Sequence, residues 1–515
     1  MSAPLVGIDL GTTFSAIAYV NDDGVPEVIP NDQGFTTTPS VVLIEDGKIV
    51  VGEEALNPWV MNEAHVVRWV KRSIGNPDFR FQGMTASEIS AEILKALKGD
   101  AERHFGQRVD EAVITCPAYF NSNEIENTRT AGELAGLRVR EIVKEPTAAA
   151  VYYGLDNLSE GEKVMVCDLG GGTYDATILA LENASFRPIA SRGSRELGGH
   201  DWTEALRDLV AERFREKFGD DPRDDPINRN KLYQACEQAK RDLTRRPEVA
   251  VPCHITRIGG DDHKVQLLQG LMEQVIVTRE DFEECTEDRI VRLVRRTEEA
   301  LEKARLTWGD IDKTILVGGA TRMPRVGDAL EQASSKKLAP TGKRDLMVVL
   351  GAAILARGEV AASRARGLTE VRPRTARGLV EVDFLRINPR NLGTRVIDTH
   401  SPEFRVTNAL IIPQGTGAPA SVTQEFEISC DDQEVFDVPV VEFENDGDYD
   451  CLCSYRFTCL PGATRGDPIA ITFNYDESSI VAVEAVDRKS GRALARERLE
   501  YVEPTLTPAA VDPAK

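Results

Sequence analysis

The pattern of hydrophobic and polar positions differs between the first two thirds of the chain and the last third. Up to about residue 360, apolar runs of strand length alternate with segments of helical periodicity. The runs include EAVITCPAYF, KVMVCDLGG and KTILVGG, and the helical segments include ISAEILKALKGDAERHF and LYQACEQAKRDLTRR. From about residue 378, short alternating runs such as QEFEIS and PIAITFNY are separated by turns such as ENDGD and PGATRGD. The pattern predicts an α/β region followed by an antiparallel β region.

These two patterns divide the chain into four predicted segments. An α/β domain covers residues 1–362, a linker containing arginines covers 363–389, a β-sandwich covers 390–500, and a tail covers 501–515. The tail is rich in Pro and Ala without apolar periodicity, so we expect it to be disordered. Within the linker, the stretch SRARGLTEVRPRTAR carries five arginines that could read an anionic patch, although a solvated linker is the favoured interpretation. They are Arg364, Arg366, Arg372, Arg374 and Arg377.

Composition favours a multidomain globular protein. The 515 residues are 41% hydrophobic and 28% charged, and no apolar run reaches the ~18 residues of a membrane span. The N-terminus lacks the pattern of a signal peptide, so we expect a cytoplasmic protein without membrane contact. The net charge of -22 opposes nucleic-acid binding, because most of the surface repels phosphate.

The nine cysteines are typical of a reducing compartment, because their number is odd and their spacing forms no disulfide framework. Cys451, Cys453 and Cys459 lie close together in the sequence. No histidine is near enough to complete a tetrahedral metal site. We therefore interpret them as ordinary core or surface cysteines.

An internal duplication points to the chemistry. LVGIDLGTTFSAIAYV and VMVCDLGGGTYDATIL each combine a strand, an Asp-Leu-Gly turn and a second strand, with one extra residue in the later copy. Glycine turns and threonines can offer N–H and hydroxyl groups to a triphosphate, while Asp9 and Asp168 can face Mg2+. One such turn alone is more often a simple hairpin, but two in equivalent contexts favour a phosphate site between duplicated lobes.

A third glycine pair follows an apolar strand in ILVGGATRMP. Gly318 and Gly319 could let a base and ribose lie against the backbone, with Arg322 stacked over the base. An ordinary strand-to-helix turn is the competing interpretation.

Seven motifs in order closely resemble the ATPase domain of the Hsp70 chaperone family. They are GIDLGTTFS, VITCPAYF, VKEPTAAA, DLGGGTYD, LGGHDW, EQAKRDL and ILVGGATRMP, and they cover nearly all of residues 4 to 360. NLGTRV, DDQEVFDVPV and ITFNYDESSIVAVEAVDRKSG resemble the substrate-binding sandwich of that family more loosely. The resemblance implies a two-lobed α/β ATPase domain of the actin/hexokinase type, followed by an antiparallel β-sandwich.

The resemblance also implies the roles of individual residues. The catalytic set would be Lys71, Glu145, Asp168 and Thr173, and the metal set Asp9, Asp168 and Asp175, acting mainly through water. Nucleotide would contact Gly11, Thr12, Thr13, Gly170, Gly171, Gly172, Gly199, Glu237, Lys240, Arg241, Thr244, Gly318, Gly319, Arg322 and Asp345. The implied ligands are ATP or ADP with Mg2+, and K+ is left open as a further ion. Without the resemblance, Lys71 would be interpreted as a solvated helix lysine.

The resemblance implies a peptide channel in the sandwich, where an extended segment is held by main-chain hydrogen bonds and an apolar pocket. The matching positions are Thr394, Ile397, Phe426, Phe436 and Val438. A plain sandwich core would place apolar residues at the same positions. Thr394 stands where an aliphatic residue is expected, which predicts a smaller or more polar pocket.

Several features depart from the family pattern. The helical lid expected after the sandwich is missing from this sequence, and the interdomain stretch VDFLRINP contains Asp383 and Arg386. Ile125 replaces an arginine linked to coupling, while Glu141 and Lys144 replace residues that face the J-domain co-chaperone. Residues 76–90 look shortened. These departures place coupling, J-domain stimulation and a nucleotide exchange factor in doubt and leave the catalytic set intact.

The leading hypothesis is an Hsp70-like chaperone that slowly hydrolyses ATP and binds extended hydrophobic segments of unfolded polypeptides. The alternative is a nucleotide-dependent scaffold whose sandwich binds a dedicated partner and is uncoupled from the ATPase. A small-molecule kinase of the same superfamily is a third possibility that the sandwich disfavours.

Overall fold

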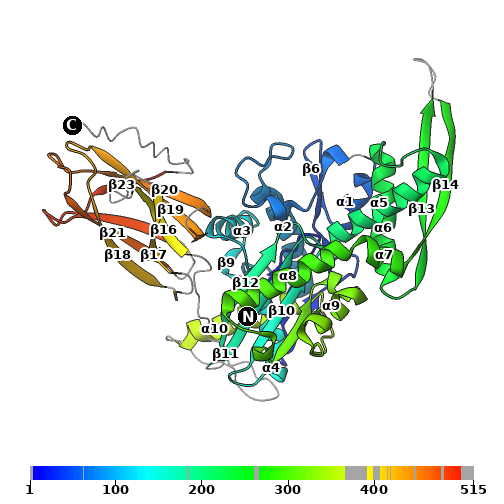
Figure 1. The fold of residues 1–515 in the computed structure, drawn as a ribbon, viewed down its shortest axis with the longest axis horizontal. Coiled ribbons are helices and arrows are strands. Elements are labelled where there is room, and N and C mark those ends of the chain that lie inside the picture. Colours follow the sequence, from blue (N-terminus) through cyan, green and yellow to red (C-terminus); the bar gives the residue numbers. More distant parts are fainter. Residues whose placement is uncertain are drawn as a thin grey trace. The chain divides into compact units, whose positions relative to one another are not determined.

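The computed structural model describes residues 4–61, 63–182, 185–259, 266–365, 391–397, 406–413, 416–417, 419–445, 448–476 and 481–499. Beyond residues 363–365, the predicted linker lies outside this part of the chain, as does the whole predicted tail. The chain divides into two units (Figure 1). The first comprises Met1–Tyr119 and Asn127–Asp383, and the second comprises Phe120–Glu126 and Phe384–Lys515.

The first sheet of the α/β part has the order β3-β2-β1-β8-β9, with β4 paired to β2. Its strands are β1 (Leu5–Asp9), β2 (Phe14–Val20), β3 (Pro26–Ile29), β4 (Thr38–Pro39), β8 (Glu111–Cys116) and β9 (Arg138–Lys144). The hairpin of β1 and β2 is antiparallel, whereas β8 joins β1 in parallel. The sheet therefore combines an N-terminal hairpin with strands that arrive through helical crossovers.

The second sheet repeats this arrangement in the order β12-β11-β10-β15. Its strands are β10 (Lys163–Leu169), β11 (Tyr174–Glu182), β12 (Ser185–Ser194) and β15 (Lys313–Val317). The hairpin of β10 and β11 is antiparallel, and β15 joins β10 in parallel. The duplicated motif in the sequence thus forms the same element in both sheets.

The two hairpins have equal length, which corrects the prediction of an extra residue in the later copy. Asp9 pairs with Ala16, and Asp168 pairs with Asp175, so residues 10–15 and 169–174 occupy equivalent positions. Because register fixes which face a side chain takes, the second hairpin presents Asp175 where the first presents Ala16.

Two helices rich in alanine pack against each other and against the sheets. Helix α10 (Met347–Ala365) contacts β1, β2, β3 and β8, and helix α4 (Glu145–Asn157) contacts α10 and β10. Ala352, Ala353 and Ala356 of α10 are buried, as are Ala148 and Ala149 of α4. Small side chains let the two helices approach each other closely. Helices α10 and α4 therefore link the first sheet to strand β10.

The remaining elements of the α/β part surround these two sheets. They are a small sheet of β5 (Val41–Glu45), β6 (Lys48–Val51) and β7 (Val66–Arg68), the hairpin of β13 (Glu248–Gly259) and β14 (Gln266–Thr278), and the helices α1 (Glu53–Trp59), α2 (Ala86–Phe105), α3 (Ser122–Leu134), α5 (Gly199–Phe218), α6 (Pro226–Leu243), α7 (Arg279–Cys285), α8 (Glu287–Ala304) and α9 (Pro324–Ser334). Short 3-10 turns are η1 (Glu63–His65), η2 (Val70–Ser73), η3 (Trp308–Asp310) and η4 (Gly319–Arg322).

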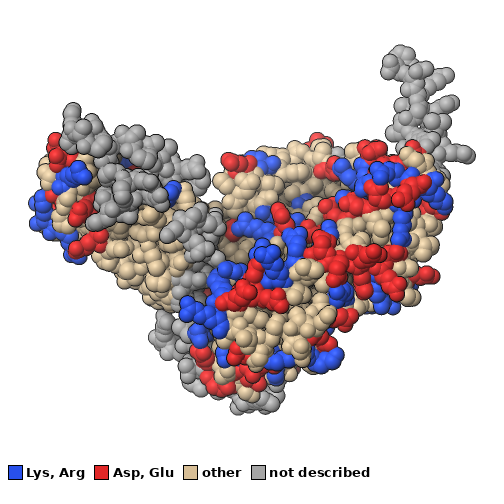
Figure 2. Space-filling view, in the orientation of Figure 1, with Lys and Arg blue, Asp and Glu red and all other residues tan. Residues whose placement is uncertain are grey.

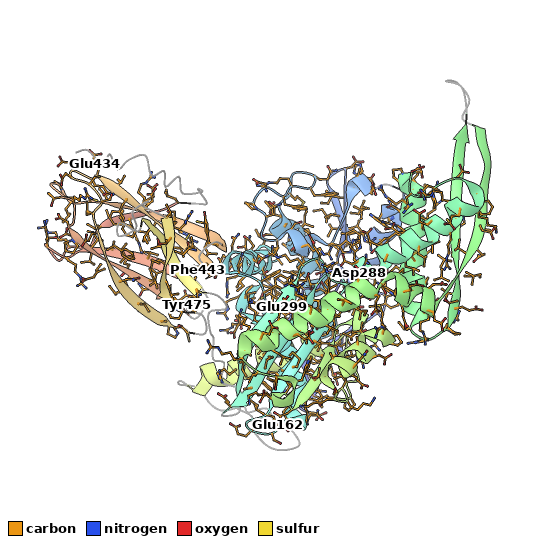
Figure 3. All side chains as sticks on the ribbon, viewed as in Figure 1. Glu162, Asp288, Glu299, Glu434, Phe443 and Tyr475 are labelled. Carbon is orange, nitrogen blue, oxygen red and sulfur yellow. The ribbon has the colours of Figure 1, made fainter. Side chains whose placement is uncertain are left out.

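The sandwich consists of a five-stranded sheet, β17-β16-β19-β20-β23, and a three-stranded sheet, β18-β21-β22. The strands are β16 (Asn391–Ile397), β17 (Val406–Ile412), β18 (Ala420–Glu427), β19 (Val435–Asn445), β20 (Asp448–Thr458), β21 (Pro468–Tyr475), β22 (Val481–Asp487) and β23 (Ala495–Leu499). Alternate residues of β22 are buried, as the period of a strand requires. Buried Phe443 and Tyr475 come from different sheets (Figure 3).

Charged side chains of both signs are mixed on the visible face of the α/β part (Figure 2). On α8, for example, Glu299 accepts hydrogen bonds from Arg295 at 3.0 Å and from Arg296 at 2.6 Å. Such exposed pairs contribute little stability. Within the described ranges, no helix is long and apolar enough to cross a bilayer.

Candidate functional site: a cleft where the two hairpins meet

A cavity of about 380 Å³ lies in the α/β part and gathers most of the predicted site residues. The predicted residues that line it are Asp9, Gly11, Thr12, Thr13, Lys71, Glu145, Asp168, Gly170, Gly171, Thr173, Gly199, Glu237, Lys240, Arg241, Gly318, Gly319, Arg322 and Asp345. Gly172, Thr244 and Asp175 were also predicted, and they are not among the lining residues. Residues far apart in the sequence therefore converge on one cleft.

The turns of the two hairpins touch each other at the floor of this cleft. A Cβ atom on Gly171 would lie 1.9 Å from Oγ1 of Thr13, so only glycine permits the contact. Helix α5 holds the second turn from behind, because the N–H groups of Gly199 and His200 donate to the carbonyl oxygens of Gly170 (2.9 Å) and Gly171 (2.7 Å). The turns are thus fixed before any ligand arrives.

The three predicted residues outside the lining have identifiable positions. Gly172 packs against Thr12, since an added Cβ would lie 2.4 Å from Cγ2 of Thr12. Thr244 ends helix α6, where its hydroxyl donates to the carbonyl of Arg241 at 2.7 Å. Asp175 is 2% exposed, and within the described part its Oδ1 has no hydrogen-bond partner.

Lys71 is buried at the centre of the site, with 5% of its surface exposed. The interpretation of a solvated helix lysine, which the residues alone favoured, is therefore wrong. Its Nζ lies 2.5 Å from Oε1 of Glu145, the first residue of α4. Burial by itself would lower the pKa of Lys71, but the carboxylates of Glu145 and Asp9 outweigh this effect and raise it. The ammonium group therefore stays charged.

Two further carboxylates share this ammonium group. Burial, and then repulsion from Glu145, raises the pKa of Asp9 to about 6, even though Thr115 donates a hydrogen bond to its Oδ1 at 2.9 Å. The pKa of Asp168 is also raised, by burial and then by Glu145 and Asp9. The centre thus holds more negative than positive groups, an environment suited to a hard cation with oxygen ligands. Among the described residues, no group of three or more His, Cys, Asp or Glu is placed to hold a metal directly.

Helix α6 forms the wall beside Gly199 with three charged side chains. Nζ of Lys240 donates to the Gly199 carbonyl (2.6 Å) and to Oε2 of Glu237 (2.8 Å). Burial opposes ionisation of Glu237, yet Lys240 more than compensates and lowers the pKa of Glu237 to about 2. Arg241 also donates to Glu237, at 3.1 Å. The wall therefore offers fixed polar groups rather than mobile ones.

The opposite wall is formed by the turn after β15. Gly318 has a φ of 83°, and an added Cβ would lie 2.3 Å from the Leu169 carbonyl oxygen. Glycine is therefore required both for the backbone conformation and for the approach to β10. Arg322 and Asp345, both partly exposed, form an ion pair of 2.5 Å at the rim.

Sequence reasoning missed several residues of the site. The ring of Phe14 lies 5.4 Å from the Arg241 guanidinium, and Arg344 lines the cleft beside Asp345. Arg72 donates from Nε to the Gly172 carbonyl at 3.1 Å and pairs with Asp201 at 3.2 Å. The adjacent pair of basic residues in VKRSIG was the available signal for Arg72.

The predicted peptide-lining residues occupy positions typical of a sandwich core. Val438 belongs to the hydrophobic core and is 2% exposed, and Thr394 is 3% exposed. Phe426 and Phe436 pack against that core, and the ring of Phe436 stacks on Phe457 at 5.4 Å. The side chain of Ile397 lies outside the described part. Their role in binding peptide stays a prediction.

Three residues that depart from the family pattern lie in the described part of the chain. Ile125 and Glu141 are buried, and Nζ of Lys144 donates to the Pro117 carbonyl at 3.3 Å. Asp383 and Arg386 lie outside the described residues, as do the side chains of the linker arginines. Cys453 is buried, whereas Cys451 and Cys459 are half-buried.

Comparisons with known proteins agree with this geometry. The family model described as Hsp70 protein matches residues 5–83 and 78–502. The chain is 38% identical over 499 residues to the chaperone protein DnaK of Halobacterium salinarum, covering 96% of this chain and 74% of that protein. It is 37% identical over 496 residues to the chaperone protein DnaK of Thermotoga petrophila, covering 95% of this chain and 79% of that protein.

These matches confirm the predicted fold class, a two-lobed ATPase domain of the actin/hexokinase type followed by an antiparallel β-sandwich. They also confirm the leading hypothesis of an ATP-dependent chaperone. The family model covers the cleft, the duplicated hairpins and the sandwich, and the chain belongs to the Hsp70 family.

Proposed function

We propose that this chaperone binds ATP with its phosphates between the two hairpin turns and hydrolyses it slowly. The observation that carries the proposal is the convergence, in one cavity, of a buried ammonium group, the three carboxylates of Asp9, Glu145 and Asp168, and two glycine turns. The turns at 11–13 and 170–173 offer N–H and hydroxyl donors to phosphate oxygens. The walls formed by α6 and by the turn after β15 would hold the adenosine.

Mg2+ fits the donor set of this cleft. Asp9 and Asp168 supply oxygen atoms, and their pKa values are raised by burial and then by neighbouring carboxylates, whose negative charge a divalent cation would offset. Both carboxylates would hold the ion mainly through water, and Asp175 would contribute from behind. When bound, Mg2+ would neutralise charge on the phosphates.

Within this scheme the protein side chains mainly position and neutralise. Lys71 would stabilise the negative charge that develops on the γ-phosphate, and Glu145 fixes the ammonium group at 2.5 Å. The hydroxyl of Thr173 would donate to a phosphate oxygen. Asp168, with its raised pKa, would orient the attacking water and can accept its proton. No strong base is needed, because phosphoryl transfer depends mainly on positioning and charge neutralisation.

We propose that the sandwich binds extended apolar segments of unfolded polypeptides. Thr394, Phe436 and Val438 come from neighbouring strands of one sheet, and Phe426 comes from the other. A J-domain protein and an exchange factor are further proposed partners, although Glu141 and Lys144 predict weaker stimulation by the first of these. Ile125 predicts weaker coupling between the two domains.

Single-turnover ATP hydrolysis with and without a saturating apolar peptide tests the proposal. Thr173→Ala serves as a matched control that removes one phosphate donor. We expect measurable hydrolysis by the wild type, acceleration by peptide, and strong loss in the variant. An unchanged rate, with peptide binding confirmed by fluorescence anisotropy, would instead support the uncoupled scaffold. Failure to bind ATP by calorimetry would refute the nucleotide site itself.

A further inference from the structure

Three aromatic rings surround one arginine beside the cleft, two from nearby in the sequence and one from helix α6. The guanidinium carbon of Arg68 lies 4.2 Å from the ring centroid of Trp59, 4.3 Å from that of Trp69 and 5.2 Å from that of Tyr233. The ring of His200 lies 4.2 Å from that of Trp69. We call these five residues the Arg68 cage. The family motifs assign none of them a function.

The cage borders the nucleotide cleft. Arg68, Trp69, His200 and Tyr233 line a second cavity of about 350 Å³. This cavity shares seven lining residues with the cleft, namely Thr13, Phe14, Gly171, Gly199, Glu237, Lys240 and Arg241. A change in the cage therefore occurs next to residues proposed to contact nucleotide.

Trp69 adopts a backbone conformation that bulky residues rarely take. Its φ of 57° and ψ of 26° lie in the left-handed region, and it precedes the turn η2 that carries Lys71. The carbonyl of Trp69 accepts the N–H of Arg72 at 3.0 Å, closing that turn. A conformation of this kind persists when its surroundings hold it in place, and the surroundings of Trp69 are the rings and the guanidinium of the cage.

Arg68 is held in part by the aromatic rings. Within the described residues, its Nε and Nη1 are buried without hydrogen-bond partners, and burial lowers its pKa. A cation that is removed from water interacts more strongly with aromatic faces. The rings of Trp59 and Trp69 therefore help to position Arg68, together with its hydrogen bond to Tyr233 and the attraction of Glu237.

The cage also joins the Lys71 turn to helix α6. Tyr233 lies on α6, and its hydroxyl is 2.7 Å from Nδ1 of His200. On the same helix, Asn230 donates to Glu63 at 2.9 Å, next to the segment that leads into β7. Helix α6 further carries Glu237 and Lys240 of the cleft wall. Contacts through the cage thus connect the turn that carries Lys71 to the helix that carries Glu237 and Lys240.

We infer that Arg68 and Trp69 are positioning residues for ATP hydrolysis that act through Lys71. The cage holds the turn in the conformation that places the Lys71 ammonium beside Glu145, and it ties that placement to helix α6. This inference rests on the proposed role of Lys71 in the cleft. A cage that merely stabilised the fold would affect unfolding but not the hydrolysis rate of folded protein.

The test uses variants that separate the ring from the backbone. Trp69→Gly removes the ring while keeping the left-handed conformation accessible, whereas Trp69→Phe keeps an aromatic face. Arg68→Met keeps the length of the side chain and removes the charge. Tyr19→Leu is the matched control, because Tyr19 lies in another ring cluster, 5.0 Å from Phe105, away from the cleft.

We expect the single-turnover rate at saturating ATP to fall about tenfold to a hundredfold in Trp69→Gly, as for a displaced catalytic group. The rate should fall about threefold to tenfold in Arg68→Met, by the weaker effect of losing the cation–π contacts to the rings. Trp69→Phe should recover most of the rate, and Tyr19→Leu should match the wild type. Amide hydrogen exchange at residues 70–74 should increase in Trp69→Gly and stay unchanged in Tyr19→Leu.

The inference is overturned if Trp69→Gly and Arg68→Met fold and hydrolyse ATP at the wild-type rate. A slower rate with unaltered exchange at residues 70–74 would also overturn it, because the effect would then not pass through the Lys71 turn. If the wild type and Lys71→Ala hydrolyse ATP equally, the proposed function fails instead. The exchange measurement, made without nucleotide, would still decide whether the cage holds the turn.

Discussion

The nucleotide cleft and the β-sandwich bury different kinds of side chain. The cleft buries Lys71, Glu145 and Asp168, which are charged and would be costly to bury without partners. The buried interior of the sandwich is mostly apolar, with Val438 and Phe457 as typical members. A buried charge needs a specific explanation, whereas a buried valine does not. Residue chemistry therefore identifies the cleft as a site and leaves the sandwich ambiguous.

The largest expected effect comes from removing the buried cation of the cleft. Lys71→Ala should reduce the single-turnover rate of ATP hydrolysis by at least about a hundredfold, comparable to losing a donor that stabilises developing charge. Calorimetry should still detect ADP binding. Full activity in this variant would contradict the assignment of Lys71 and weaken the contrast between the two regions.

A second change tests whether the contact between the two turns matters. Gly171→Ala places a methyl group 1.9 Å from Oγ1 of Thr13, so the turns must separate. We expect ATP affinity to fall about tenfold, in line with the ~1–3 kcal/mol cost of overpacking. Gly342→Ala is the control, because nothing lies within 4 Å of an added Cβ there. Equal affinities in the two variants would show that the hairpin turns need not touch.

In the sandwich, truncating a buried side chain should lower stability without changing the ATPase rate. Val438→Ala should lower the free energy of unfolding of that unit by about 2 kcal/mol, as expected for a buried cavity. Urea unfolding measures this loss, and the ATPase rate without peptide should not change. If stability is unaffected and peptide affinity drops, Val438 lines the channel and the contrast with the cleft disappears.

The last prediction concerns His200, whose pKa is lowered to about 4 by burial and then by Arg72. Because the unfolded chain titrates near 6.5, it binds the proton first as the pH falls, so stability should decline between about pH 6.5 and 4. His200→Gln lacks this titration and should show a shallower decline in urea unfolding. Parallel pH profiles for the two proteins would show that His200 is not buried in this way.

Local signals in the sequence predicted the α/β region, the β region and the glycine turns of the cleft, whereas the other cleft residues came from the resemblance to the family. Asp-Leu-Gly turns with threonines mark the hairpins, and alternation marks strands such as β22. The burial of Lys71 could not be predicted locally, because its partner Glu145 lies on a distant helix. The Arg68 cage was missed for the same reason, since Trp59, Trp69 and Tyr233 meet only after folding.

The peptide positions illustrate a second limit. A strand presents one side chain in two to the interior, whether that interior is a closed core or an open channel. Thr394 and Val438 therefore satisfy both interpretations from sequence, and both are buried in the structure. A structure with a bound peptide would distinguish them.

The equal length of the two hairpin turns restricts how this chain can evolve. A strand reverses the face of every following side chain when one residue is inserted or deleted, so a length change within 10–15 or 169–174 would turn β2 or β11 inside out. A library of single-residue insertions and deletions should therefore be depleted in these two windows far more than a library of substitutions. At these two turns, changes in length are therefore tolerated less than changes in residue type.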